Sequence, residues 1–261
     1  MPFARVGRVH LHYRIDSDSA GPPLVLSNSL GAALEMWEPQ MAALASRFRV
    51  VRYDSRGHGQ SDVPRGPYSI DDLGNDVLGL LDTLGIERAH FCGLSMGGAV
   101  GLWLGVNAPE RIDRLVVANT GAKIGNAESW NARIDAVRRD GMASIASAVL
   151  SRWFSRTLLE QPTPLVAKLR RTFEATSSDG YAAACAAVRD FDLRRVVHRI
   201  HVPTLVIAGS EDASTPAADG RFLAEQIPGA QYVELEAPHL SNIQAASAFT
   251  QALLHFLTEH H

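Results

Sequence analysis

Short apolar runs recur along the chain, and amphipathic stretches separate them. Runs of about five residues with few charges predict strands that are covered on both faces of a sheet. Because such strands alternate with helical stretches, the pattern predicts a mostly parallel sheet with right-handed crossovers. Residues 1–16 alternate like a further strand. The apolar runs are Pro23–Ser27, Val50–Asp54, His90–Leu94, Leu115–Asn119, Thr204–Ala208 and Tyr232–Leu235.

The clearest helical pattern covers Ser69–Leu84, where leucine and valine side chains recur at helical spacing on one face. Ser69 can cap its start, Asp72 suits the positive end of the helix dipole, and Gly85 can end it in a left-handed conformation. A second helix is expected to follow Ser95. A last helix is expected over Asn242–Leu257.

Residues 121–199 interrupt the alternation, because they contain helical stretches and no convincing strand. We expect an all-helical cap inserted before the last two strands, with residues 1–120 and 200–261 forming the sheet-containing core. The insertion carries 13 Lys and Arg against 8 Asp and Glu, so the cap is positive and the rest of the chain negative. The expected cap helices are Glu128–Arg139, Met142–Phe154, Pro164–Ala175 and Gly180–Arg189.

Composition removes several function classes. The chain has 261 residues, 46% of them hydrophobic, with a formal net charge of −3. This is the balance of a globular protein with a large core, and it offers no basic excess for nucleic acid or a membrane surface. Two cysteines and a charged, strand-like start predict a cytoplasmic protein without a secretory signal. His260 and His261 are given no functional weight.

One motif carries nucleophile chemistry. Gly93-Leu94-Ser95-Met96-Gly97 follows an apolar strand directly and precedes a helix. In that setting a G-x-S-x-G sequence is a nucleophile elbow, because the serine lies on a sharp turn that exposes its hydroxyl. The small residues on either side are needed because strand and helix backbones approach closely. Ser95 is therefore the expected nucleophile.

A serine nucleophile needs a base and an orienting carboxylate, in the chain order serine, acid, histidine. His239 fits the base, because it lies in a loop between the last strand and the last helix. His198 and His201 precede a strand instead, at the wrong end for the site, and His255 lies inside a helix. The acid is expected after Thr204–Ala208, where two adjacent carboxylates occur, Glu211 and Asp212.

The oxyanion of a tetrahedral intermediate needs two N–H donors. The backbone N–H of Met96, the residue after the nucleophile, is one. The other is expected from the loop after Pro23–Ser27, and we choose the N–H of Leu30.

Other polar segments predict no cofactor or metal. The segment Asp54–Gly59 combines Asp, Arg and His but lacks metal-ligand spacing, so we interpret it as a hydrogen-bonded turn below the active site. The glycines around Ser95 do not follow G-x-G-x-x-G, so no dinucleotide cofactor is predicted.

These residues resemble the α/β-hydrolase family along essentially the whole chain. GLSMGG at the elbow, YDSRGHGQSD after an early strand and the late Asp and His carry the resemblance, which selects Asp212 as the acid. The chain is most similar to the 3-oxoadipate enol-lactonases of aromatic-acid breakdown. The similar pieces are Ser27–Gly31, Asn119–Gly125 and Glu128–Arg133.

The resemblance implies a small anionic substrate, a five-membered enol-lactone that bears an acetate side chain. Arg133 and Lys123 are the expected partners of the carboxylate, and Trp130 and Trp153 are expected to line the pocket. A broader carboxylesterase, a hydrolase of carbon–carbon bonds and a ligand receptor with an intact triad stay open as alternatives, because the cap selects the leaving group. The sequence does not decide between a monomer and a homo-oligomer.

Overall fold

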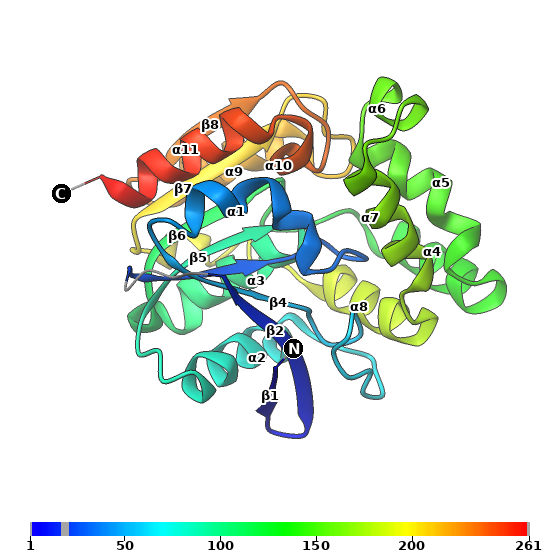
Figure 1. Cartoon of the computed structure of the whole chain (residues 1–261), viewed down its shortest axis with the longest axis horizontal. Helices are drawn as coiled ribbons and strands as arrows, with labels where there is room; N and C mark the ends of the chain where they lie inside the picture. Colours follow the sequence, from blue (N-terminus) through cyan, green and yellow to red (C-terminus); the bar gives the residue numbers. More distant parts are fainter. Residues whose placement is uncertain (1, 17–20, 260–261) are drawn as a thin grey trace.

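The structure is a computed structural model that describes residues 2–16 and 21–259, so the two C-terminal histidines lie outside it. Its centre is an eight-stranded sheet in the order β1-β2-β4-β3-β5-β6-β7-β8 (Figure 1). The strands β1 and β2 pair antiparallel, as do β2 and β4, and all other neighbours are parallel. The strands are β1 Phe3–Val6, β2 Val9–Asp16, β3 Pro23–Ser27, β4 Arg49–Tyr53, β5 Ala89–Leu94, β6 Ile112–Ala118, β7 Thr204–Gly209 and β8 Gln231–Leu235.

The predicted mostly parallel α/β sheet is confirmed, and each apolar run of the sequence forms a strand within about three residues of its expected ends. The strands β5 and β7 are buried at every position, as expected for strands that helices cover on both faces. In place of the one strand expected at the start of the chain, residues 3–16 form two, because Gly7, at φ +58°, allows a tight turn between them.

Helices cover the sheet. Helices α2, α3 and α9 pack against strands, and α1 packs against α11. Their bounds are α1 Glu38–Leu44, α2 Ile70–Thr83, α3 Met96–Asn107, α9 Ala217–Gln226, α10 Ser241–Gln244 and α11 Ala246–Thr258, with short 3-10 turns at Leu34–Trp37, Pro109–Arg111 and Val197–Arg199.

The helix predicted over Ser69–Leu84 is confirmed, together with Ser69 as its N-terminal capping residue. The Ser69 hydroxyl accepts from the Asp72 N–H at 3.1 Å while the Asp72 carboxylate accepts from the Ser69 N–H at 2.9 Å, which is a reciprocal capping box. The single helix predicted over Asn242–Leu257 is wrong, because the structure has α10 and α11 with a break at Ala245. The carbonyl of Asn242 accepts from the Gln40 amide at 2.7 Å, so a tertiary hydrogen bond takes the place of a helical one.

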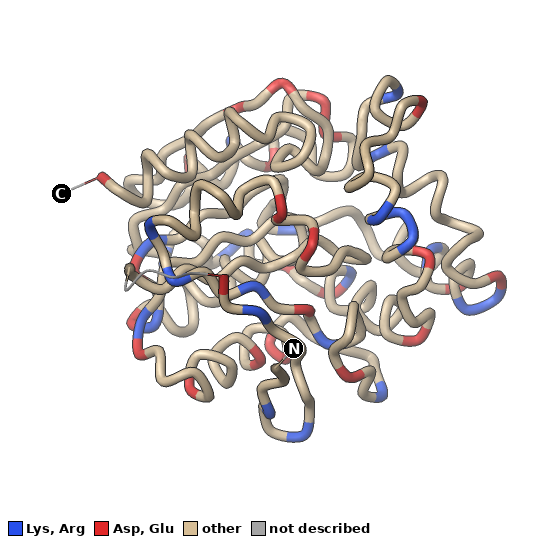
Figure 2. Tube along the Cα trace, viewed as in Figure 1, with Lys and Arg blue, Asp and Glu red and all other residues tan. Residues whose placement is uncertain are grey.

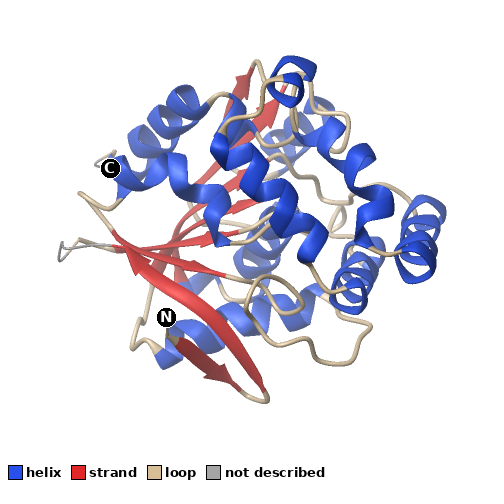
Figure 3. Ribbon diagram, turned by 45° about the vertical axis from the view of Figure 1, so that its right-hand side comes forward, coloured by secondary structure: helices blue, strands red, loops and turns tan. Residues whose placement is uncertain are grey.

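Five helices lie between β6 and β7 in the sequence and gather beyond the ends of the strands (Figures 1 and 3). We call this group the cap. Two glycine contacts hold it closely to the core: a Cβ on Gly57 would come 2.9 Å from Gly180 Cα, and one on Gly66 would come 2.4 Å from Ala183 Cβ. The cap helices are α4 Ala127–Asp140, α5 Met142–Trp153, α6 Arg156–Glu160, α7 Pro164–Ala175 and α8 Ser178–Asp190.

Basic and acidic residues of the cap are interspersed along its helices (Figure 2). Many of the basic side chains make ion pairs with acidic neighbours, as Arg156 does with Glu160 and Arg170 with Glu174. These ion pairs offset only part of the positive charge of the cap. Within the described ranges, no helix has the length and apolar character needed to cross a bilayer.

Candidate active site

Ser95 lies on the sharp turn that the sequence predicts, between the end of β5 and the start of α3. Its backbone has φ +58°, which is uncommon for a residue with a side chain, and the turn is held by the Ser95 N–H, which donates to Ala118 O at 2.9 Å. A Cβ on Gly93 would lie 2.0 Å from Gly97 O, and one on Gly97 would lie 2.3 Å from Ser27 O. The glycines are therefore required by the close approach of the backbones.

His239 and Asp212 form a hydrogen-bonded pair beside this turn. His239 Nδ1 lies 2.7 Å from Asp212 Oδ2, and both side chains are buried. Ser95 and His239 line the same cavity. The pairing leaves His239 Nε2 as the ring nitrogen that can take a proton from a nucleophile.

The carboxylate of Asp212 is stabilised as an anion. Burial raises its pKa, but the His239 hydrogen bond and charge, together with hydrogen bonds from Asn119 and Thr215, outweigh burial and hold the pKa below its usual range. Oδ1 accepts from the N–H groups of Ser214 and Thr215 at 2.8 and 3.0 Å. Asp212 therefore stays ionised beside the histidine.

Asn119 connects the two loops that carry the acid and the base. Its Nδ2 donates to Asp212 Oδ2 at 2.9 Å, and its Oδ1 accepts from the hydroxyl of Ser241, two residues after His239. Asn119 has φ +45°, a left-handed conformation that asparagine tolerates better than most residues. The amide of Asn119 thus orients the carboxylate of Asp212.

The base loop is also attached to the cap. The N–H groups of His239 and Leu240 donate to the carbonyls of Arg152 and Trp153 at the end of α5, at 3.2 and 3.1 Å. These carbonyls belong to the last turn of a helix, where no intrahelical partner is left for them.

Two backbone N–H groups near Ser95, those of Met96 and Leu30, have no hydrogen-bond acceptor among the described residues. Met96 is the first residue of α3, so its N–H has no intrahelical acceptor. Leu30 lines the cavity, and its N–H donates to no acceptor among the described residues. The two segments are joined directly, because the Gly97 N–H donates to Asn28 O at 3.0 Å.

The cavity above Ser95 has a volume of about 120 Å³ and is walled by the cap. Of the four residues expected to bind substrate, Trp130, Arg133 and Trp153 line it. Lys123 does not; its Nζ lies 3.9 Å from Asp192 Oδ2, outside the lining. The lysine prediction therefore finds no support in the position of the side chain.

The structure adds two polar side chains that sequence reasoning missed, Arg152 and Tyr181. Arg133 stacks over the Trp130 ring at 4.8 Å, and neither Arg133 nor Arg152 makes an ion pair among the described residues. Burial raises the pKa of the Tyr181 phenol, and the two arginine charges offset only part of this effect, so the phenol is neutral. A net positive wall faces the nucleophile.

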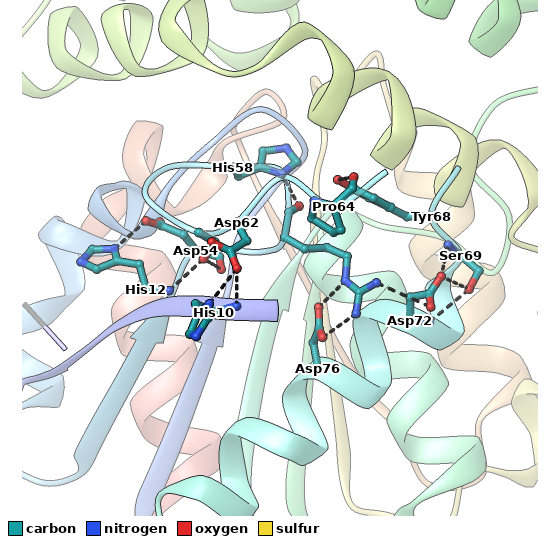
Figure 4. A network of polar contacts seen from close by, with 12 residues as sticks. His10, His12, Asp54, His58, Asp62, Pro64, Tyr68, Ser69, Asp72 and Asp76 are labelled. Atoms are coloured by element: carbon teal, nitrogen blue, oxygen red, sulfur yellow. Dashed lines mark hydrogen bonds and ion pairs between the residues drawn. The ribbon is translucent and has the colours of Figure 1, made fainter. Parts of the chain in front are cut away.

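The turn after β4 is held by a network of polar contacts (Figure 4). Asp54 Oδ2 accepts from His12 Nδ1 at 2.7 Å, and its Oδ1 accepts from the Leu34 N–H at 2.9 Å. Arg56 makes two hydrogen bonds of 2.6 Å to Asp76. In the part of the chain that the structure describes, no three His, Cys, Asp or Glu side chains are grouped to hold a metal ion.

Comparison with known proteins assigns the fold family. The family described as alpha/beta hydrolase fold matches residues 22–246. The chain belongs to the α/β-hydrolase family. A relative named 3-oxoadipate enol-lactonase 2, from Acinetobacter baylyi, is 45% identical over 94% of this hydrolase and 92% of its own length.

Solved structures give a similar result. The enol-lactonase from Burkholderia xenovorans LB400 superimposes with a TM-score of 0.97 at 50% identity, over 99% of this α/β hydrolase and 100% of that chain. A more distant relative, named putative carbamate hydrolase RutD from Azorhizobium caulinodans, is 33% identical over 99% of both chains.

Proposed function

We propose that this α/β hydrolase opens 3-oxoadipate enol-lactone to 3-oxoadipate, with Ser95 as nucleophile, His239 as base and Asp212 as the orienting acid. The observation that carries the proposal is the placement of Ser95 and His239 in a cavity whose cap wall holds two arginines that pair with no acidic side chain in the described part of the chain. Enol-lactonases at 45% and 50% identity support the choice of substrate. The proposal places the protein in cytoplasmic breakdown of aromatic acids.

The first half-reaction opens the ring. Ser95 Oγ attacks the lactone carbonyl as His239 Nε2 takes the hydroxyl proton. The resulting oxyanion accepts hydrogen bonds from the N–H groups of Leu30 and Met96. The bond between the carbonyl carbon and the ring oxygen then breaks. The ring oxygen leaves as an enol that takes the proton from His239, and the enol tautomerises to a ketone.

The second half-reaction releases the product. The leaving group stays attached to the acyl chain, so the acyl-enzyme holds the whole opened molecule as an ester of Ser95. His239 removes a proton from water, the hydroxide adds to the ester carbonyl, and Ser95 leaves with the proton returned by the histidine. The same two N–H donors stabilise the second oxyanion.

The cap supplies recognition of the acetate side chain. Arg133 and Arg152 provide planar donor forks that suit a carboxylate, and the stacking on Trp130 fixes the orientation of the Arg133 guanidinium. Trp130 and Trp153 cover the apolar ring.

The proposal is tested by following the ultraviolet absorbance of freshly generated enol-lactone with wild-type protein. Ser95→Ala and His239→Ala should each abolish the loss of absorbance while the fold survives, because each removes an essential participant in acyl transfer. Circular dichroism and thermal unfolding provide the control for folding.

Three outcomes separate the alternatives. Fast loss with wild type alone supports lactonase and nucleophile together. Slow loss of lactone with rapid cleavage of an aryl ester would indicate a broader esterase. No multiple turnover of either substrate would favour a receptor that uses the same fold.

A further inference from the structure

The turn that carries Leu30 is fixed by a buried histidine from the neighbouring loop. The Gly31 N–H donates to His58 Nε2 at 2.9 Å, and the His58 side chain is buried. We propose that His58 is a positioning residue of the oxyanion hole, which holds the Leu30–Gly31 peptide so that the Leu30 N–H stays directed at the substrate carbonyl. The inference rests on the proposed function, because it takes Leu30 as an oxyanion donor.

The geometry of the turn shows why this contact matters. Ser29 O accepts from the Ala32 N–H at 3.0 Å, and Gly31, third in the turn, has φ +82°. This is the arrangement of a type II turn, whose central peptide can rotate toward type I unless something holds it. The N–H of this central peptide belongs to Gly31, and it donates its hydrogen bond to His58 Nε2. The hydrogen bond therefore fixes the peptide that follows Leu30, while the Leu30 N–H, which belongs to the preceding peptide, has no acceptor among the described residues.

His58 can accept this bond only with Nε2 unprotonated. Its Nδ1 lies 3.2 Å from Arg56 O, which is an acceptor, so the ring proton is assigned to Nδ1. Burial lowers the pKa of His58, although the Arg56 carbonyl and the charge of Asp54 act in the opposite direction. The ring is therefore neutral and presents a lone pair to Gly31.

The histidine and the turn are both confined by the cap. Gly57, next to His58, packs against Gly180 of α8 so closely that a Cβ would come 2.9 Å from its Cα. A Cβ on Gly31 would lie 2.7 Å from the Phe173 ring of α7 and 3.0 Å from Tyr181. The hydrogen bond between His58 and Gly31 lies within the core, and the cap packs against both sides of it, which is the kind of preorganised support that keeps a catalytic donor in place.

Two amide variants separate this role from a merely structural one. In His58→Asn the short amide reaches the former Nδ1 position, so it can keep the contact with Arg56 O but cannot reach Gly31. In His58→Gln the longer amide reaches the former Nε2 position and can accept the Gly31 N–H. Neither side chain titrates, and both are polar. His10→Asn is the matched control, because His10 is an exposed histidine of the same network that pairs with Asp62 (Figure 4).

We expect His58→Asn to lower kcat by roughly 10- to 100-fold with little change in KM, which is less than complete loss of an oxyanion donor. The inhibition constant for n-butylboronic acid, which forms a tetrahedral adduct with Ser95, should rise by a similar factor. His58→Gln should recover kcat and boronate affinity to within about threefold of wild type, as measured per folded protein. His10→Asn should match wild type.

Wild-type kcat in His58→Asn, or an equal loss in His58→Gln, would overturn the inference, as would a loss that appears in KM while boronate affinity is unchanged. Failure of wild type to hydrolyse the enol-lactone would refute the proposed substrate instead. The boronate measurement, with an aryl ester for turnover, would still decide the role of His58.

Discussion

The amide of Asn119 offers the sharpest test of how the acid and base loops are held together. Asn119→Gly removes the donor to Asp212 Oδ2 and the acceptor of the Ser241 hydroxyl. Glycine adopts φ +45° without steric strain, so this variant removes the side chain with no clash at the turn, whereas Asn119→Ala would add about 1 kcal/mol of backbone strain. A hydrogen bond to a charged group contributes roughly 1.5–3 kcal/mol and a neutral one about 1 kcal/mol. We expect a loss of about 2–4 kcal/mol in the free energy of unfolding.

The pH dependence of that loss has a defined sign. The pKa of Asp212 is lowered in the folded protein, partly by Asn119, so the carboxylate contributes stability above its unfolded pKa of about 3.9 that is lost as the pH falls through the folded value. The difference between wild type and Asn119→Gly in urea unfolding should therefore be constant above about pH 5 and shrink below about pH 4. Because the orientation of His239 also loosens, kcat should fall by about 10-fold.

Two results would refute this reasoning. A change of less than about 0.5 kcal/mol in unfolding free energy would mean that the amide contributes no more than an ordinary surface contact. An unchanged kcat together with a large loss of stability would mean that Asn119 holds the fold but does not orient the catalytic pair.

The remaining predictions concern the cap wall and the elbow. Arg133→Ala and Arg152→Ala should each raise KM for the anionic enol-lactone by about 10-fold or more while changing KM little for α-angelica lactone, which has a methyl group in place of the acetate; equal changes for both lactones would exclude these arginines as carboxylate partners. Gly93→Ala should destabilise the fold by about 3 kcal/mol or more in thermal unfolding, because its Cβ would lie 2.0 Å from Gly97 O. A near-normal melting temperature with full activity would contradict the close approach at the elbow.

The sequence predicts the strands well because parallel strands buried on both faces leave continuous apolar runs, as in β5 and β7. It predicts α2 to within a residue because periodicity and a capping pair agree there. Helices α1 and α9 carry weaker patterns, and the sequence does not predict them. The break between α10 and α11 depends on Gln40, about 200 residues away, so local propensity could not predict it.

In the candidate site, too, local sequence patterns predict some residues, while others depend on tertiary packing. Ser95, Asp212 and His239 are predicted by motif, chain order and resemblance, since strand ends and loops fix their places. Arg152 and Tyr181 escape notice because their roles depend on how cap helices pack around the cavity. A cue was present for Tyr181, the one aromatic residue in the alanine-rich helix α8, but helical spacing alone cannot tell a cavity wall from a buried core. Lys123 directly precedes Ile124 and Gly125, which line the cavity, but its own side chain lies outside the lining.

The bonds from the base loop to the end of α5 have a consequence for how substrate enters. A cap that swung away from the sheet as a rigid lid would have to break both N–H contacts with Arg152 and Trp153, and would leave His239 without part of its support. An open form of that kind would be inactive. Substrate binding through wide opening would therefore require both hydrogen bonds of the His239 loop to re-form in every catalytic cycle. The route of lowest free energy keeps α5 fixed and admits the lactone by movement of side chains alone. His239 then keeps its supporting hydrogen bonds while substrate enters and product leaves.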